Sequence, residues 1–75
     1  MGDAVLDSTM KREADRLLVQ IRQADSMTDA ANASATAKGF VLGLETAGAL
    51  RAGDAENLYL VFESALQQRL KILVA

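Results

Sequence analysis

The sequence contains no cysteine, no histidine and no proline. Without cysteine and histidine it lacks the usual ligands of zinc and other transition metals, the thiol nucleophile and the commonest general base. A disulfide framework, from which many small domains gain stability, is excluded as well. We therefore expect no enzyme, no metal and no cofactor, and a fold stabilised by its own packing or by association with another chain.

The sequence also lacks a large excess of charge of either sign, because 8 basic and 10 acidic residues are interspersed and give a net charge of −2. No global field attracts nucleic acid or an anionic membrane, so we expect neither as a partner. The apolar run from Gly39 to Leu44 is far shorter than the roughly 20 residues that span a bilayer, and the N-terminus lacks the pattern of a signal peptide. We expect a small acidic, cytoplasmic protein.

Apolar residues at steps of three and four place one face of a helix near the N-terminus. This spacing predicts an amphipathic helix over residues 3–25. Val19 is the one large apolar residue among the polar side chains of the opposite face, and we name it as a candidate partner contact. The members of the apolar face are Leu6, Met10, Ala14, Leu17, Leu18, Ile21 and Ala24.

The middle segment repeats this spacing and predicts a second helix over residues 28–48. Gly39 and Gly43 lie inside the pattern, where we expect a neighbouring helix to approach closely, although a break at Gly39 is an alternative. Gly48 is expected to end the helix in the left-handed conformation. The expected apolar stripe consists of Ala30, Ala33, Ala37, Phe40, Leu44 and Ala47.

The third helix is predicted over residues 54–74, with Asp54 as its N-terminal cap. Its acidic start and basic end agree with the helix dipole. Its apolar residues spread over an arc of about 180°, wider than one neighbouring helix requires. They are Leu58, Val61, Phe62, Ala65, Leu66, Leu70, Ile72 and Leu73.

Three helices with short turns predict an all-α fold, an up-down-up bundle forming a single domain over residues 1–75. Leu42 projects from the middle helix opposite Phe40, so the second half of that helix is apolar nearly all round. Either the first and third helices cover its two sides, or a second copy of the chain covers one of them. We expect self-association, because so small a core gains from it.

Two residues of the third helix are further candidate contacts. Leu60 points away from the apolar arc, beside Glu56, Gln67 and Lys71, either as an ordinary exposed leucine or as a partner contact. Arg69 falls within the arc. It either extends to solvent or bonds the last carbonyls, or else it pairs with a carboxylate from another helix or another chain, or contacts an anionic ligand.

Arg12 and Arg16 form the only basic ridge, one helical turn apart. Phosphate contact is a possible use of the ridge, but acidic neighbours interrupt it and no aromatic residue is interleaved for base stacking. A solvated face is the favoured interpretation, and a nucleic-acid-associated regulator is the alternative.

The segment Ala24 to Met27, "ADSM", resembles the Asp-Ser-Leu of acyl carrier proteins, whose serine carries phosphopantetheine at the start of a helix. The resemblance covers these four residues and implies Ser26 as the modified residue. Ser26 is also a natural N-cap for the helix that follows, with Asp29 at the reciprocal capping position. We favour the cap.

The function that these observations favour is a non-catalytic protein-interaction module. It would act through apolar helix faces, as a homodimer or within a larger assembly. Regulators, inhibitors, adaptors and chaperone-like subunits all fit this description.

Overall fold

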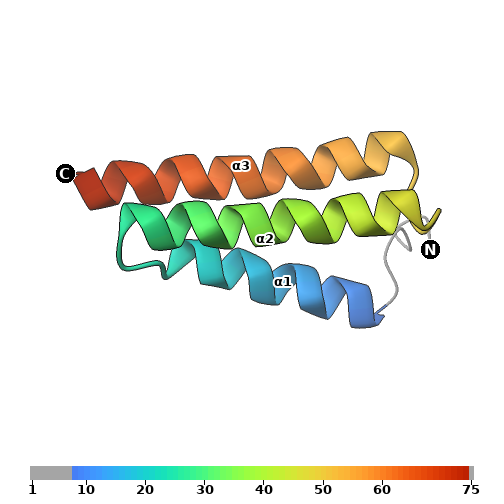
Figure 1. Ribbon diagram of the computed structural model, residues 1–75, viewed down its shortest axis with the longest axis horizontal. Coiled ribbons are helices and arrows are strands. Elements are labelled where there is room, and N and C mark those ends of the chain that lie inside the picture. The colour runs from blue at the N-terminus through green and yellow to red at the C-terminus, as the bar shows by residue number, and fades with distance from the viewer. Residues whose placement is uncertain (1–7, 75) are drawn as a thin grey trace.

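Three α-helices make up the described part of the chain, residues 8–74, in the computed structural model (Figure 1). They are α1 (Ser8–Arg22), α2 (Met27–Thr46) and α3 (Ala52–Val74). Because residues 8–74 contain no strand, the prediction of an all-α protein with three helices is confirmed. Leu6 and the predicted start of the first helix at residue 3 lie outside the described residues.

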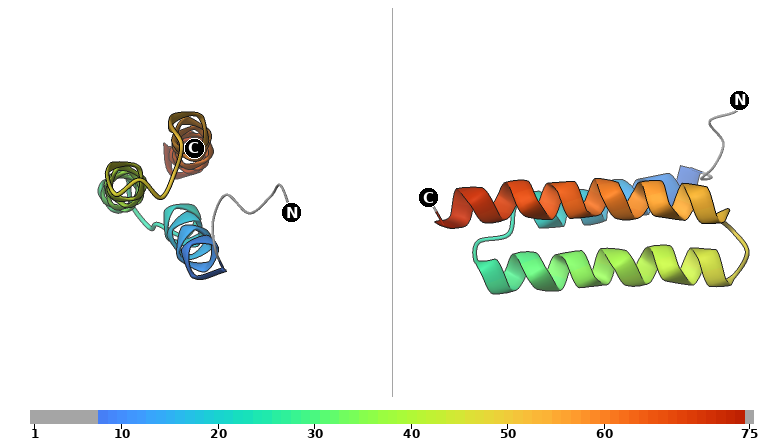
Figure 2. Two further views of the ribbon diagram at one scale, coloured as in Figure 1. Left: turned by 90° about the vertical axis from the view of Figure 1, so that its right-hand side faces the viewer. Right: turned by 90° about the horizontal axis from the view of Figure 1, so that it is seen from above.

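The helices pack compactly around one axis. Figure 1 shows that the chain reverses direction at each connection, and the end-on view in Figure 2 places the three helices at the corners of a triangle. Each helix contacts both of the others. Each therefore buries the side that faces the shared axis.

Two predicted helix boundaries are wrong. α1 ends at Arg22 instead of residue 25, because the Ala24 amide donates to the Ile21 carbonyl at 3.3 Å, a tighter turn than the α-helical one. α3 begins at Ala52, and the Ala55 amide already donates to the Arg51 carbonyl at 2.9 Å. Asp54 is therefore not the cap; it lies in the first turn, where a carboxylate still favours the helix dipole.

The predicted N-cap of α2 and its terminating glycine are confirmed, although the helix spans Met27–Thr46 instead of residues 28–48. At its start, Ser26 has extended backbone angles and its Oγ accepts the Asp29 amide at 3.0 Å, which satisfies one of the free donors of the first turn. At its end, Gly48 adopts a φ of +78°. The Gly48 amide donates to Glu45 at 3.0 Å and the Ala49 amide to Leu44 at 2.8 Å, the paired bonds of a Schellman motif.

The predicted buried face is confirmed for the described part of α1, and only in part for α2 and α3. The described members of the first face are buried or half-buried, but in α2 the buried side is centred on Ser34 and Val41, while Phe40 and Leu44 are only half-buried. In α3 the prediction is wrong for Val61 and Ile72, which are exposed. The fully buried side chains are Phe62, Leu17, Ile21, Val41 and Ser34.

The expectation that a helix packs closely on Gly39 and Gly43 is wrong. A Cβ placed at either residue would meet nothing within 4 Å, so both glycines face open space. Neither interrupts α2, which is continuous from Met27 to Thr46. They carry the cost of an interior glycine without a packing role.

We therefore predict that Gly39→Ala and Gly43→Ala each stabilise the protein by about 0.5–1 kcal/mol, because alanine restricts the unfolded chain and clashes with nothing. Thermal unfolding followed by circular dichroism measures the effect. Gly48→Ala is the matched control, and it should destabilise by about 1–2 kcal/mol because alanine resists a positive φ. Destabilisation by the first two variants would contradict the open space around them.

Candidate protein-interaction surface

Several large apolar side chains remain at the surface of the described chain. α2 and α3 supply most of them. A soluble domain tolerates single exposed apolar residues, so only those that share a face are informative. They are Val19 on α1, Met27 and Leu42 on α2, and Leu60, Val61, Ile72 and Val74 on α3.

Leu42 is one of these exposed residues, with 56% of its surface accessible. The alternative in which α1 and α3 cover opposite sides of α2 is therefore wrong. Because α1 and α3 contact each other as well as α2, they lie on the same side of it, as the end-on view shows (Figure 2). Coverage of Leu42 by a second copy stays a prediction.

Leu42 and Leu60 lie on the same face of the molecule. The ion pair between Lys38 Nζ and Glu63 Oε1, at 3.3 Å, marks where the outer sides of α2 and α3 meet. Leu42 follows Lys38 by about one turn, and Leu60 precedes Glu63 by about one turn. Since α2 and α3 run in opposite directions in Figure 1, both leucines lie toward the same end of the bundle, one on each helix.

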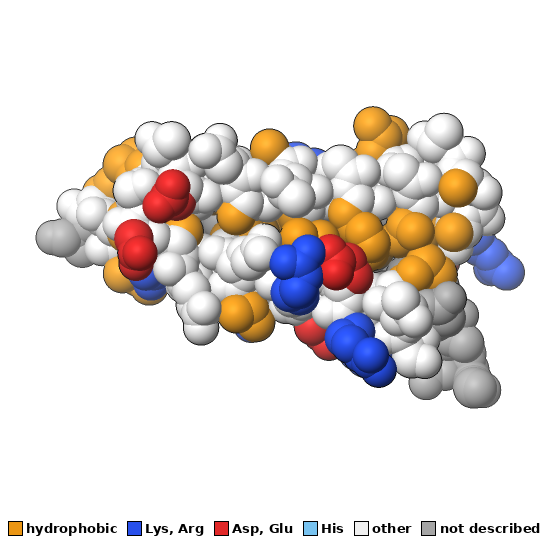
Figure 3. All heavy atoms as spheres, turned by 60° about the horizontal axis from the view of Figure 1, so that its bottom comes forward, with side chains coloured by type: hydrophobic (Ala, Val, Ile, Leu, Met, Phe, Trp, Pro, Cys, Tyr) orange, Lys and Arg blue, Asp and Glu red, His pale blue; other side chains and the backbone are white. Residues whose placement is uncertain are grey.

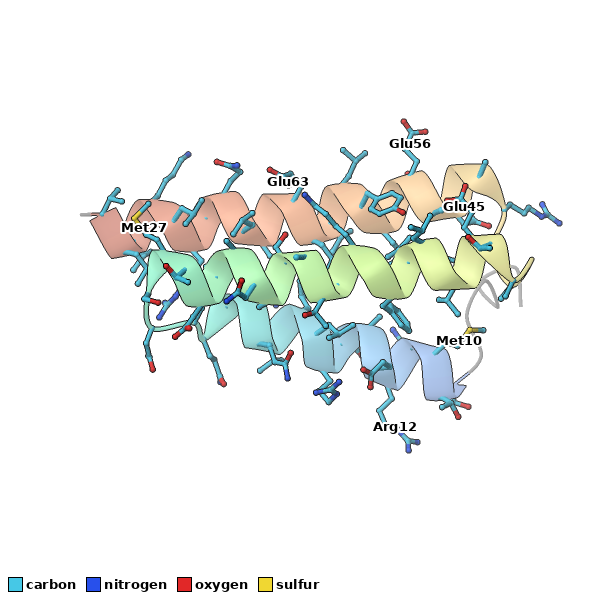
Figure 4. All side chains as sticks on the ribbon, viewed as in Figure 1. Met10, Arg12, Met27, Glu45, Glu56 and Glu63 are labelled. Carbon is cyan, nitrogen blue, oxygen red and sulfur yellow. The ribbon has the colours of Figure 1, made fainter. Side chains whose placement is uncertain are left out.

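We call this surface the α2/α3 face. Its residues recur at steps of three and four, which keeps them on one side of each helix. Glu56 and Glu63, labelled in Figure 4, project from the same side of α3. The face comprises the exposed residues Ala31, Ala35 and Leu42 of α2 and Glu56, Leu60, Gln67 and Lys71 of α3, with the Lys38–Glu63 pair across its middle.

The centre of the α2/α3 face is held by hydrogen bonds. Gln67 Nε2 donates to Glu63 Oε2 at 2.9 Å, while Lys38 approaches the other oxygen. The Gln67 bond and then Lys38 lower the pKa of Glu63 below its usual value. Glu63 is thus ionised at neutral pH and fixes Lys38 and Gln67 in place.

Val19 and the basic ridge lie on α1, away from this face. A groove of 510 Å³ runs between α1 and α2, lined by Thr9, Met10, Arg12, Glu13, Arg16 and Phe40. Figure 3 shows hydrophobic side chains there beside basic and acidic ones.

Arg16 is already paired within this groove. Its Nε donates to Glu13 Oε1 at 3.0 Å and its Nη2 contacts Glu13 Oε2, so the hydrogen bonds lower the pKa of Glu13 and raise that of Arg16. The structure thus places Leu42 and Leu60 on one face, and Val19, Arg12 and Arg16 on α1.

Arg69 has a partner that neither sequence alternative named. Its Nε donates to the backbone carbonyl of Ala24 at 2.8 Å, in the connection between α1 and α2. The bond ties the end of α3 to that connection and satisfies a carbonyl beyond the end of α1. Nothing in the sequence pattern pointed to Ala24, because the contact joins segments far apart in the chain.

Among residues 8–74 no group of three or more acidic side chains gathers as a metal site. No described helix is both long enough and apolar enough to cross a membrane.

We predict that Arg69→Met destabilises the fold by about 1–2 kcal/mol, because the Ala24 carbonyl loses a charged donor while the apolar stem is retained. Urea unfolding measures the difference. Arg12→Met is the matched control: Arg12 is exposed, and its loss should change stability by less than about 0.5 kcal/mol. Equal effects of the two variants on stability would contradict a structural role of Arg69.

Comparison with protein-family models, with curated proteins and with solved structures found no match to this chain. The α2/α3 face therefore has to be interpreted from its own residues.

Proposed function

We propose that this protein is a non-catalytic protein-interaction module that associates with a second copy of itself through the α2/α3 face. The observation that carries the proposal is the pair of exposed leucines on one face, Leu42 at 56% and Leu60 at 62% accessible. Full burial of a leucine contributes about 1.5–3 kcal/mol. A symmetric contact would remove four of these side chains from water.

The size of the face fits a weak dimer. Two helices about 30 Å long and about 10 Å wide present roughly 600 Å² per subunit. Stable interfaces begin at about 1,200 Å² in total, so the face reaches the lower limit, and we expect a dissociation constant on the order of micromolar. An up-down-up bundle supports this use, because its connections lie at the two ends and leave the face free of loops.

The role of such a module in a cytoplasmic setting is that of a regulator, inhibitor, adaptor or chaperone-like subunit. The alternative uses have less support. Arg16 is held by Glu13, which weakens the basic ridge as a phosphate-binding surface. The Ser26 oxygen accepts the Asp29 amide, as a cap residue does, which favours capping over attachment of phosphopantetheine.

We predict that Leu42→Glu and Leu60→Glu each weaken self-association at least tenfold while leaving the helical content unchanged. Both side chains are exposed, so their replacement costs little in the monomer, whereas a carboxylate buried in the interface is costly. Light scattering and sedimentation over about 5–500 μM measure association, and circular dichroism checks the fold.

Val19→Glu is the matched control, because Val19 is comparably exposed at 45% but lies on α1. It should associate like the parent protein. A parent protein that stays monomeric at every concentration would overturn the homodimer.

A further inference from the structure

We infer that the second copy binds in one register: a two-fold axis perpendicular to the helices lays α3 antiparallel on the α3 of the partner subunit. This inference rests on the proposed self-association and adds which residues meet. It follows from the order of charges along the α2/α3 face.

The residues that α3 contributes to the two ends of the α2/α3 face lie at nearly equal distances on either side of the midpoint of the helix. α3 spans Ala52–Val74, so its centre lies at residue 63. Glu56 and Lys71 lie at nearly equal distances on either side of it, and so do Leu60 and Gln67. Glu56 and Lys71 are separated by about 22 Å along the helix, at about 1.5 Å per residue.

An antiparallel copy reverses this order and therefore pairs opposite charges. Glu56 meets the partner subunit's Lys71, and Lys71 meets the partner subunit's Glu56, which gives two equivalent contacts. Neither residue takes part in either ion pair of the described chain, Arg16–Glu13 or Lys38–Glu63. Opposite charges at matched positions favour this register, and like charges would disfavour it.

The same operation accommodates the leucine of α2. Because Lys38 pairs with Glu63, residue 38 of α2 lies level with residue 63 at the centre of α3. Leu42 then lies over Ala31 and Ala35 of the partner subunit, both exposed and small enough to receive it. The Lys38–Glu63 pair faces its own copy near the axis, lysine opposite lysine and glutamate opposite glutamate, so the charges that favour this register are those at the two ends of the face, Glu56 and Lys71.

The other two-fold arrangement on this face exchanges the Glu56–Lys71 contacts for acidic ones. An axis parallel to the helices would lay α3 on the partner subunit's α2 at the same level. Counting from the Lys38–Glu63 pair, Glu45 of α2 is level with Glu56 of α3, and Figure 4 shows both at one end of the bundle. That arrangement would set each Lys38 level with the partner subunit's Glu63, but it would set each Glu56 against the partner subunit's Glu45, so two acidic contacts would replace the two Glu56–Lys71 contacts.

Charge reversal tests the register directly. Glu56→Lys alone sets lysine against lysine, and Lys71→Glu alone sets glutamate against glutamate, so each should raise the dissociation constant about tenfold at low salt. An equimolar mixture of the two variants should form a heterodimer, because one subunit then carries two lysines and the other two glutamates. The double variant should associate like the parent protein. Native mass spectrometry and sedimentation measure these species.

Glu45→Lys is the matched control, since it reverses an acidic charge on α2 at the same end of the bundle. In the inferred register it changes association less than about twofold, whereas in the parallel arrangement it would strengthen association. A parent dimer whose association is unchanged by Glu56→Lys and Lys71→Glu, or strengthened by Glu45→Lys, would overturn the register and leave self-association standing. A monomeric parent would instead overturn the proposed function. Circular dichroism confirms that each variant is folded.

Discussion

A bundle of three helices has one central axis, and each helix can bury only the side that faces it. In this chain the buried core has a small volume, because many of its residues are alanines. They are Ala14 from α1, Ala37 from α2, and Ala55 and Ala65 from α3. Phe62 is the one large aromatic residue that is fully buried. Several large apolar side chains that lie beyond this core, such as Leu42 and Leu60, therefore remain exposed.

The polar contacts of the structure hold the bundle together at its edges. Arg69 ties the end of α3 to the connection between α1 and α2 through the Ala24 carbonyl. Lys38 and Glu63 join the outer sides of α2 and α3. An exposed ion pair of this kind contributes little to stability, so its main consequence is alignment: it sets which residues of α2 lie level with which residues of α3.

That alignment links the fold to the proposed function. Leu42 and Leu60 lie on different helices, and only the alignment of α2 with α3 along the bundle shows that they share one level. Once aligned, they form one face with complementary charges at its two ends, Glu56 and Lys71. Reversed on itself, a face of this order sets Glu56 against Lys71, and this is the arrangement that we propose for the dimer.

Helix positions and both ends of α2 could be predicted from the sequence, since periodicity, Ser26 and Gly48 are local signals that depend on backbone hydrogen bonding within a few residues. The predicted Asp54 cap of α3 was wrong, because that helix begins two residues earlier. The buried face of α1 was also predictable, because its polar and apolar residues are sharply separated. Only the tertiary structure decided the buried side of α2, where Val41 and Ser34 are buried while the expected Phe40 and Leu44 are half-buried. The second half of that helix is apolar nearly all round, so packing against two neighbours decides which of its sides is buried. The open space around Gly39 and Gly43, the Arg69 contact and the shared face of Leu42 and Leu60 were likewise decided by tertiary structure, because each depends on how residues distant in the chain are placed.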